Sequence, residues 1–403
     1  MLRREYLYMN EETFSTGCDL LDLVVGGGER HGYPAGRIIN LVGDRSSGKT
    51  FLACELIAAA FHQWGERFRW VYDDAESGFT FNTERLYGFH IMPVEEEKRT
   101  KSRRVEAFSC NFREFLNSLG PKELGVYTLD TLDGLSSKQI HDIAKKRFEN
   151  FKEGKDMEKG SYQMEAPKFL SQEFFKETTA EAEEKKALLV IISQVRDKID
   201  SMFNEQTRSG GRAMDFYAHT CLWLSTAQKI VRKGRVVGVV VKAYTKKSKT
   251  PRPFRSCFFT LLFDYGLDNV GTNVDFLYDL RTEKGELRNS TSLQWSDSAV
   301  EKTPKALVEF VRGQGREEEY KVAKKELKLE GVKKISEWII STDMKAAFEA
   351  QFGICMDRND LIDWIEENHK EAELTQKVRA KWEMIEDSIK TERPPKYPPK
   401  EAS

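Results

Sequence analysis

The eight residues GDRSSGKT, at positions 43–50, have the types and spacing of a loop that holds phosphate groups. The glycines let the backbone wrap closely round an anion, and the N–H groups of such a loop point inward at the positive end of a helix dipole. Lys49 would reach the β- and γ-phosphates of a nucleotide, and the Thr50 hydroxyl would bind Mg²⁺. Apolar residues 38–42 before the loop and Ala-rich residues 51–61 after it are typical of a strand and a helix, which disfavours a chance match in a Gly/Ser turn. We therefore expect ATP or a close relative to be bound by Gly43, Asp44, Arg45, Ser46, Ser47, Gly48, Lys49 and Thr50.

Short apolar runs bounded by polar residues recur along the first 290 or so residues and are typical of buried parallel strands. These runs are residues 37–42, 68–73, 125–129, 187–193 and 220–224. Amphipathic stretches lie between them, at residues 51–64, 111–119 and 167–186. The alternation predicts a doubly wound α/β core with a mostly parallel sheet. Two later runs, residues 236–246 and 256–266, predict an antiparallel extension of that sheet.

From about residue 300 the pattern changes to short helical segments with cap signals. Thr303 and Pro304 predict the start of one helix, Gly331 the end of another, and Asp360 the start of a third. We therefore expect a small helical C-terminal domain. The expected divisions are a short N-terminal segment at 1–14, the core at 15–290, the helical domain at 300–390 and a disordered tail at 391–403.

The composition describes a charge-rich chain, with 39% hydrophobic and 32% charged residues among 403. No apolar run approaches the roughly 20 residues of a membrane helix. Residues 1–10 lack the apolar region of a signal peptide, so we expect a soluble cytoplasmic protein with no membrane partner. Six scattered cysteines with no CxxC pair predict reduced, buried thiols rather than zinc sites or disulfides.

Positive charge is concentrated in one stretch although the formal net charge is −1. Ten Lys and Arg, and no Asp or Glu, lie between Lys229 and Arg255. A solvated hairpin and a polyanion-binding surface both account for this pattern, and charge alone does not separate them.

Polar side chains end or follow three of the expected parallel strands. Because the carboxyl ends of such strands meet at one edge of the sheet, these side chains are expected beside the phosphate loop. Asp130 would orient Mg²⁺ and its waters, and Glu76 would accept a proton from water that attacks the γ-phosphate. Gln194 would sense the γ-phosphate by hydrogen bonding. Any one of them alone would more often be a helix cap, but their joint placement favours catalysis.

These motifs, in this order, resemble those of the RecA recombinase family. The family's opening element and phosphate loop have counterparts in STGCDLLDL and GYPAGRIINLVGDRSSGKT. The segment of its catalytic glutamate resembles VYDDAES, and its magnesium-side strand resembles TLDTLDGL. Its switch glutamine and second DNA-binding loop resemble VIISQVRDKIDSMFNEQTRSGGRAMDFYA, and the end of its first DNA-binding loop resembles GSYQMEAPKFLSQEFFK. The resemblance runs from Ser15 to Asp279 and implies a RecA-like P-loop ATPase core.

The resemblance also implies site residues that spacing does not suggest. In KKSKTPRPF it implies that Lys247 and Lys249 reach the ATP of an adjacent subunit and act in catalysis with Lys49, Glu76 and Gln194. It implies DNA-binding loops at about residues 151–165 and 195–211. The expected DNA-binding residues are Met164, Arg196, Lys198, Ile199, Met202, Phe203, Arg208, Gly210 and Gly211.

The residue types of the second loop agree with contact to unpaired DNA. Arg196, Lys198 and Arg208 can neutralise phosphates. The glycine pair allows close backbone approach, and Ile199 and its apolar neighbours can act as wedges or stacking surfaces for bases. A hydrophobic loop folded over a neighbouring helix is the alternative.

The resemblance implies an ATP- and Mg²⁺-using, DNA-dependent ATPase that forms a homo-oligomeric filament on single-stranded DNA. Such a protein pairs this strand with homologous double-stranded DNA and exchanges strands. Single-strand-binding or mediator proteins are implied partners, at the nucleoid or, for a viral protein, in the host cytoplasm. Two alternatives stay open: a hexameric, helicase-like ring motor with the same core, and a recombination mediator of low turnover.

Several positions depart from the family pattern. The segment before Ser15 is short, and Asp197 and Asp200 put negative charge into the second loop. Thr83 stands where an aromatic residue commonly covers adenine, with Phe79 or Phe81 as substitutes. These departures indicate a divergent member, viral or otherwise distant.

Overall fold

In the computed structural model, the described residues are 12–27, 31–137, 145, 152, 169–197, 206–208, 211–250, 252–288, 293–295 and 303–393. The chain divides into two compact units. The first comprises Met1–Asn273, Glu283–Glu286 and Lys377–Ser403, and the second comprises Val274–Thr282 and Leu287–Gln376.

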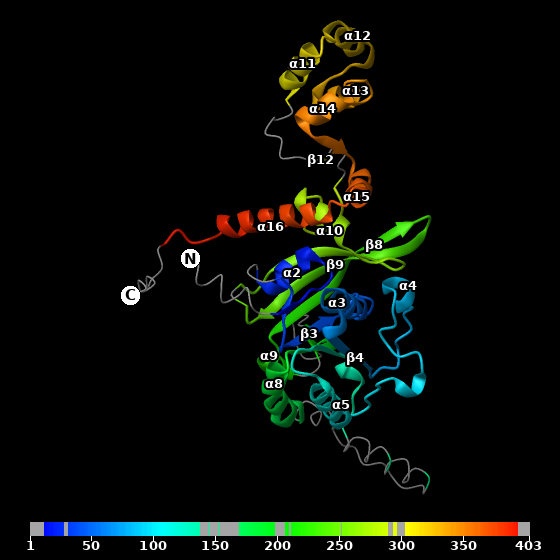
Figure 1. The fold of residues 1–403 in the computed structure, drawn as a ribbon, viewed down its shortest axis with the longest axis vertical. Coiled ribbons are helices and arrows are strands. Elements are labelled where there is room, and N and C mark those ends of the chain that lie inside the picture. The colour runs from blue at the N-terminus through cyan, green and yellow to red at the C-terminus, as the bar shows by residue number, and fades with distance from the viewer. Residues whose placement is uncertain are drawn as a thin grey trace. The chain divides into compact units, whose positions relative to one another are not determined.

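The first unit is built on one large sheet, which has nine strands within the described residues (Figure 1). Its order is β11-β10-β9-β8-β3-β6-β5-β4, and β7 pairs with β6. Neighbours from β4 to β8 run parallel, and β9, β10 and β11 continue the sheet in antiparallel pairing. The predicted α/β fold with a parallel sheet and an antiparallel extension is confirmed. The parallel strands are β3 (Ile38–Gly43), β4 (Phe68–Asp74), β5 (Leu124–Asp130), β6 (Ala187–Asp197) and β8 (Thr220–Arg232).

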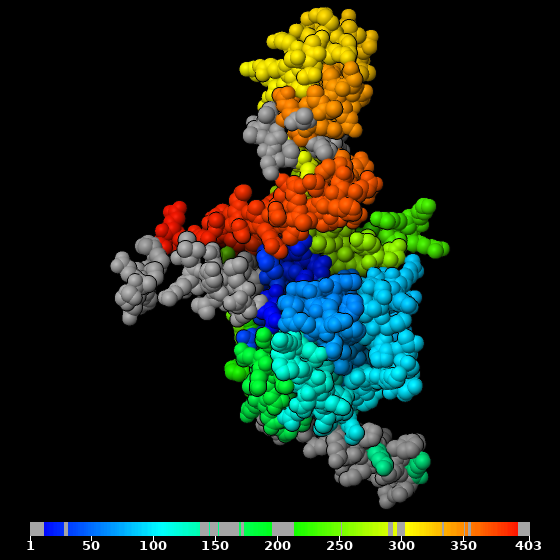
Figure 2. All heavy atoms as spheres, viewed as in Figure 1, coloured from blue at the N-terminus to red at the C-terminus, as the bar shows by residue number. Residues whose placement is uncertain are grey.

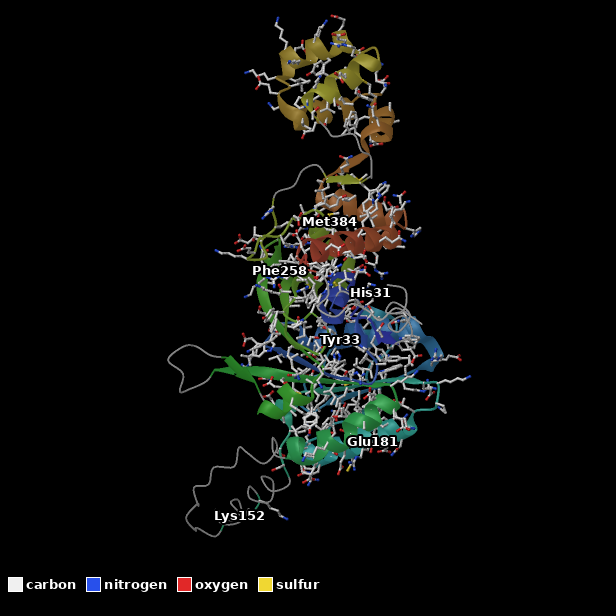
Figure 3. All side chains as sticks on the ribbon, turned by 90° about the vertical axis from the view of Figure 1, so that its left-hand side faces the viewer. His31, Tyr33, Lys152, Glu181, Phe258 and Met384 are labelled. Atoms are coloured by element: carbon white, nitrogen blue, oxygen red, sulfur yellow. The ribbon has the colours of Figure 1, made fainter. Side chains whose placement is uncertain are left out.

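Helices cover both faces of the parallel strands, as their apolar sequences require. All residues of β3 and β5 are buried. Helix α3 (Lys49–Trp64) contacts strands β3, β4, β5 and β6, and helices α5 (Val105–Ser118) and α8 (Phe175–Glu184) pack on each other and on β5 and β6. Figure 3 shows Glu181 of α8 on one side of the sheet and Tyr33 of β2 (Tyr33–Pro34) on the other. A short π-helical turn, Leu170–Phe174, precedes α8.

The antiparallel extension consists of strands much longer than the apolar runs that predicted them. Strand β8 has 13 residues where the sequence predicted only 220–224, because its second half is largely exposed and polar. It pairs with β9 (Arg235–Ser248), which pairs with β10 (Ser256–Leu262), and β11 (Gly266–Asp268) forms the edge. Strand β3 pairs with β8 only as far as Leu224, and β10 pairs with β9 only from Gly238. Residues 230–237 therefore form a two-stranded ribbon beyond the body of the sheet.

The second unit is mostly helical. Its core contains Leu307, Phe310, Ile339, Phe348 and Phe352, all buried. Strands β12 (Leu293–Trp295) and β13 (Ile354–Met356) pair antiparallel. The helices are α11 (Pro304–Gly313), α12 (Glu317–Leu327), α13 (Gly331–Ile340), α14 (Lys345–Phe352) and α15 (Arg358–Glu367).

One helix boundary in this unit was predicted well and two were not. The Thr303 side chain accepts a hydrogen bond from the Ala306 N–H and caps α11, as predicted. Gly331 begins α13 rather than ending a helix, because its positive φ of 82° serves the turn that enters α13. Asp360 does not open its helix: the carboxylate of Asp357 caps α15, and Asp360 lies within the first turn.

The last helix, α16 (Glu371–Ser388), contributes its residues from Lys377 onward to the first unit. There Val378, Trp382 and Glu386 are buried, one helical turn apart. The Glu386 carboxylate accepts hydrogen bonds from Arg252 and Arg255, at 2.6 Å from Arg252 Nη1 and 2.6 Å from Arg255 Nε. Figure 2 shows the helix, in red, on the outside of the molecule.

The predicted thiols are free in the part of the chain that the structure describes. Cys18, Cys54, Cys221 and Cys257 are buried, whereas the expectation of burial is wrong for Cys110, which is exposed on α5. No group of three or more metal-ligating side chains occurs among the described residues. None of the described helices has both the length and the apolar character needed to cross a membrane.

Candidate active site

The phosphate loop, Gly43–Thr50, connects the carboxyl end of β3 to the start of α3. Ser47 Oγ donates a hydrogen bond of 2.8 Å to the Asp44 carbonyl, which closes the turn. A Cβ atom at Gly43 would lie 2.4 Å from Ser47 Oγ and 2.5 Å from the Leu224 carbonyl, so only glycine fits there. Gly48 has a left-handed φ of 85° at the N-cap of α3. The loop therefore presents the start of a helix dipole at the edge of the sheet.

Lys49 lies over the mouth of this loop. Its ammonium donates hydrogen bonds of 2.9 Å and 2.6 Å to the carbonyl oxygens of Gly43 and Asp44. Burial lowers the pKa of Lys49, and the carboxylates of Asp130 and Asp44 oppose that shift. An anion bound in the loop would pair with a cation that the loop's own carbonyls already hold in place.

A cavity of about 610 Å³ opens beside the loop, within the roughly 300–1,000 Å³ of small-molecule sites. Phe81 contributes to its apolar wall and packs edge-on against Phe51, with 4.9 Å between ring centres. Of the two proposed substitutes for the adenine-covering aromatic residue, Phe81 lines this cavity, whereas Phe79 packs on Tyr72. The lining residues are Ser46–Phe51, Phe81, Lys229, Val236, Val239, Leu261 and Phe263.

Thr83 has a structural role in place of an aromatic contact. It is buried at the start of α4 (Thr83–Tyr87), and its hydroxyl accepts a hydrogen bond of 3.0 Å from the Ile91 N–H. Thr83 therefore ties the start of α4 to the backbone at Ile91.

Thr50 and Asp130, predicted to bind Mg²⁺, lie in direct contact. Thr50 Oγ1 donates a hydrogen bond of 2.8 Å to Asp130 Oδ2, and the Tyr72 hydroxyl donates one of 2.6 Å to the same atom. Burial raises the pKa of Asp130, while the bonds from Tyr72 and Thr50 lower it. One hydroxyl and one carboxylate fit Mg²⁺, which keeps several waters and takes its other ligands from substrate phosphates.

Glu76 and Gln194, predicted from two different strands, also meet. Gln194 Nε2 donates a hydrogen bond of 2.7 Å to Glu76 Oε1, and Thr131 Oγ1 donates one of 3.1 Å to the same oxygen. The backbone N–H of Gln194 donates a hydrogen bond of 2.8 Å to Asp133 Oδ2. The carboxylate that would accept a proton is thus bonded to the side chain that would sense the γ-phosphate.

Sequence reasoning missed four supporting residues at this edge. Thr131 and Asp133 belong to the second half of TLDTLDGL, where the repeated Thr-Leu-Asp is the available signal. Tyr72 bonds to Asp130, and Asp74 accepts bonds of 3.0 Å and 3.2 Å from the N–H groups of Gly78 and Phe79. Asp74 thereby fixes the turn that carries Glu76.

Lys247 lies at the end of β9, and Lys249 directly follows the last residue of that strand, Ser248. The Lys247 ammonium donates hydrogen bonds to the carbonyls of Asp215, Phe216 and Ala218, at 3.1 Å for Phe216 and 2.8 Å for Ala218. These carbonyls end helix α9 (Gly211–Tyr217), where a cation is favoured by the helix dipole. Lys249 is exposed, and its backbone N–H donates to the His219 carbonyl.

Most of the predicted DNA-binding residues fall outside the described residues: Met164, Lys198, Ile199, Met202, Phe203 and Gly210. The two ends of the second loop are described. Arg196 lies on β6 and Arg208 on β7 (Gln206–Arg208), and these strands pair antiparallel. Gly211 begins α9. The loop thus starts directly after Gln194, and its returning end pairs with its start, because Arg208 lies opposite Val195.

The chain is similar in sequence to a known family and to several known proteins. The RecA N-terminal domain family matches residues 3–88 and 151–268. Protein RecA of Clostridium acetobutylicum is 26% identical over 269 residues, which cover 66% of this chain and 69% of that protein. Protein RecA of Mycoplasma mycoides subsp. mycoides is 26% identical over 318 residues, covering 75% and 84%. Protein RecA of Malacoplasma penetrans is 27% identical over 268 residues, covering 66% and 74%. Residues 89–150, which include β5 and Asp130, lie outside the family match.

Proposed function

The chain belongs to the RecA family as a divergent member, and from that premise we propose that it is a DNA-dependent ATPase that promotes homologous pairing and strand exchange. We further propose that it polymerises on single-stranded DNA with ATP and Mg²⁺ bound. ATP would hold the state of high DNA affinity, and hydrolysis would release it.

The observation that carries this proposal is the bond between Gln194 Nε2 and Glu76 Oε1. Glu76 would orient and deprotonate the attacking water, which requires a free carboxylate lone pair. A γ-phosphate would compete with Glu76 for the amide of Gln194. Because Gln194 stands immediately before the loop of residues 195–211, a change in its hydrogen bonding would be transmitted to that loop within a few residues.

The nucleotide itself would be held by Lys49, the N–H groups of the phosphate loop and the Thr50–Asp130 pair. Thr50 and Asp130 would hold Mg²⁺, which would supply positive charge against the phosphates of the nucleotide. Phe81 would contact the base or ribose from the apolar wall of the cavity.

Lys247 and Lys249 would act on the nucleotide of a neighbouring copy. Within this chain the Lys247 ammonium is bonded to the end of α9, the helix that follows the DNA loop. To act on a neighbour's nucleotide, Lys247 would have to break its hydrogen bonds to these carbonyl oxygens. Helix α9 would then link DNA binding in one copy to the position of the Lys247 ammonium at the neighbour's nucleotide.

Two other functions use the same core. A hexameric ring motor would hydrolyse ATP on DNA but would form closed rings, and a mediator would bind DNA and nucleotide with little turnover. The lysine pair, Lys247 and Lys249, and the two expected DNA-binding loops favour the open filament over the ring.

The test combines imaging with activity. Purified protein, single-stranded DNA and a non-hydrolysable ATP analogue should give helical filaments in negative stain. The same protein should show ATPase activity stimulated by single-stranded DNA and should exchange strands between a circular single strand and a homologous linear duplex. Lys49→Ala serves as the control that lacks the phosphate-binding cation. Closed rings, or DNA binding without stimulated turnover, would replace the proposal with the motor or the mediator respectively.

A further inference from the structure

The second unit contains a cavity of about 680 Å³ that shares no residue with the nucleotide cavity. Residues of α13, α14, β13 and α15 line it, and its volume lies within the roughly 300–1,000 Å³ of binding sites. The lining includes one cation, Lys345, and six carboxylates: Glu337, Glu349, Asp357, Asp360, Asp363 and Glu367. The cavity is therefore strongly acidic.

Three of these carboxylates are not neutralised by the fold. Asp360, Asp363 and Glu367 are exposed and lie on one face of α15, three and four residues apart. Across the described part of the chain, no cation forms an ion pair with any of the three. Lys345 lies 3.8 Å from Glu349 instead. Their charge is available to a cation from outside the chain.

A buried hydroxyl at the same cavity points to a ligand rather than to a merely solvated acidic face. Ser336 of α13 lines the cavity and is 3% exposed, yet its Oγ has no hydrogen-bond partner among the described residues. Buried hydroxyls ordinarily find a partner, and in a helix the carbonyl four residues earlier is within reach. Thr178 and Thr179 of α8 donate in this way, with bonds of 2.6 Å to Phe174 and 2.5 Å to Phe175. Ser336 keeps its hydrogen-bonding capacity unused at the cavity wall.

The spacing and residue types favour a basic peptide as the occupant. No described group of three or more His, Cys, Asp or Glu side chains is placed to hold a single metal ion. Asp360 and Glu367 are about 10 Å apart along the helix axis, whereas alternate residues of an extended peptide are about 7 Å apart, so two cations of one segment can face this helix. Ile340, Met356 and Trp364 also line the cavity, and they would cover the aliphatic stems of Lys or Arg and an apolar side chain between them. A nucleic acid would be repelled.

We propose that this cavity binds a basic segment of a partner protein, an extended peptide with at least two Lys or Arg residues around an apolar residue. Asp360, Asp363 and Glu367 pair with its cations, and the Ser336 hydroxyl bonds to one of its polar atoms. The site uses neither ATP nor DNA, so it goes beyond the proposed function and is tested without either.

The experiment measures binding of the full chain to a fluorescein-labelled peptide, Gly-Lys-Leu-Lys-Arg-Gly, by fluorescence anisotropy. The variant Asp360→Asn/Asp363→Asn/Glu367→Gln removes the three unneutralised carboxylates and should bind the peptide about ten-fold more weakly, as expected for the loss of three exposed ion pairs. The matched control is Glu66→Gln/Glu97→Gln/Glu326→Gln, which changes the net charge equally at exposed carboxylates outside the cavity. It should keep the parent's affinity.

Two further comparisons separate a built site from general attraction between charges. Ser336→Ala should weaken binding about five-fold, because one hydrogen bond to the peptide is lost. The melting temperature of that variant should stay the same or rise, since the hydroxyl has no bond within the fold to lose. A peptide with Gly in place of Leu keeps the charge but should bind more weakly than the original, because the apolar lining then has no partner.

Four results would each overturn the proposal. The acidic variant could bind as the parent does, or the control could lose as much affinity. The two peptides could bind equally, or Ser336→Ala could keep the parent's affinity, and either result would leave the cavity as a solvated acidic surface. Displacement of the peptide by spermidine at equal concentration of positive charge would identify a polyamine site in its place.

Discussion

The parallel half of the sheet carries the candidate catalytic carboxylates, whereas its antiparallel extension carries the basic stretch. The central parallel strands β3 and β5 are buried throughout, and the carboxyl ends of the parallel strands present Asp130, Glu76 and Gln194 beside the phosphate loop. Strand β9 of the extension has a buried run at 238–241, alternates buried with less buried positions from Val241 to Lys246 and, with its neighbours, carries the basic stretch. The net charge of −1 conceals this separation.

The difference shows how one sheet can serve two chemistries. Catalytic acids need a rigid, water-poor setting, which two covered faces supply. Cations that contact a polyanion need exposure, which a sheet with one open face supplies. If copies of the chain assemble so that the extension of one meets the parallel edge of the next, a cation reaches each nucleotide from outside. The predictions below test that separation of roles.

The largest expected effect is on the cations proposed to act between copies. Lys247→Ala/Lys249→Ala should reduce DNA-stimulated ATPase by about 10³–10⁵, the range of a transition-state cation supplied by a neighbour. Mixed with Lys49→Ala, which keeps both lysines, it should regain activity, because interfaces form between an intact phosphate loop and an intact lysine pair. The measurement is turnover against mixing ratio.

The controls for this mixture are the two variants, each assayed alone under the same conditions. No recovery at any ratio, with both proteins folded and co-assembled, would count against action between copies. That outcome would leave Lys247 with a structural function only, which is to bond the carbonyl oxygens at the end of α9.

A somewhat smaller effect is expected within the acidic edge. Glu76→Gln keeps a hydrogen-bonding side chain but removes the base, so turnover should fall by about 10²–10⁴ while ATP binding persists. Lys49→Ala should lose ATP binding itself. Single-turnover hydrolysis and binding of a fluorescent ATP analogue separate the two. Unchanged turnover in Glu76→Gln would remove Glu76 from the role of base.

The parallel half of the fold could be predicted closely from the sequence. Its strands are short apolar runs, and the strand-loop-helix order of GDRSSGKT leaves little freedom. The meeting of Asp130 with Thr50 followed from the rule that parallel strands end at one edge.

The remaining features depend on pairings that leave no local pattern. The length of β8 was underestimated because strand pairing, rather than apolar content, extends it. Gly331 could end or begin a helix, since positive φ serves both. The bond of Glu386 to Arg255 joins residues 131 positions apart, and neither residue type announces the other.

The loop proposed to bind DNA, residues 195–211, allows effects of charge to be measured separately from effects of apolar contact. Arg196→Ala should weaken binding to single-stranded DNA and reduce the magnitude of its salt slope by about 0.7, because one phosphate contact is lost. Ile199→Ala should leave the slope unchanged and impair strand exchange, because the side chain would act as an apolar wedge between bases. The measurements are affinity across a salt series and a strand-exchange assay. Unaltered exchange in Ile199→Ala, or an unaltered slope in Arg196→Ala, would contradict the assignment of residues 195–211 to DNA.

The free energy of unfolding should distinguish two groups of cations in the antiparallel extension, those that stabilise the fold and those that are exposed. Glu386, with 7% of its side chain exposed, bonds to Arg252 and Arg255. Glu386→Gln should lower the free energy of unfolding of the full chain by about 1–3 kcal/mol, because two partly buried guanidinium groups lose their carboxylate. The variant Arg232→Gln/Lys233→Asn/Arg235→Gln should lower the free energy of unfolding little or not at all, because the Arg232 and Arg235 cations that it removes lie opposite each other and repel. Chemical denaturation of both variants makes the comparison, and equal losses would erase the distinction between the two groups.

The smallest expected effect concerns the pH dependence of the Mg²⁺ binding that we propose for Asp130. Burial raises the pKa of this carboxyl, so Mg²⁺-dependent nucleotide affinity should be full above the raised pKa and be lost as pH falls through it. That loss begins at higher pH than an exposed aspartate would show. Tyr72→Phe removes the hydroxyl that donates a hydrogen bond of 2.6 Å to Asp130 Oδ2. Because this bond favours the charged form of Asp130, the pH midpoint of Mg²⁺-dependent nucleotide binding should move up by about one pH unit in the variant. Tyr127→Phe is the matched control, because its hydroxyl bonds to Asp73 instead. Binding of a fluorescent ATP analogue with and without Mg²⁺, from acid to neutral pH, gives both midpoints. A midpoint in Tyr72→Phe that stays in place or moves down, while Tyr127→Phe is unchanged, would mean that Asp130 does not control the metal.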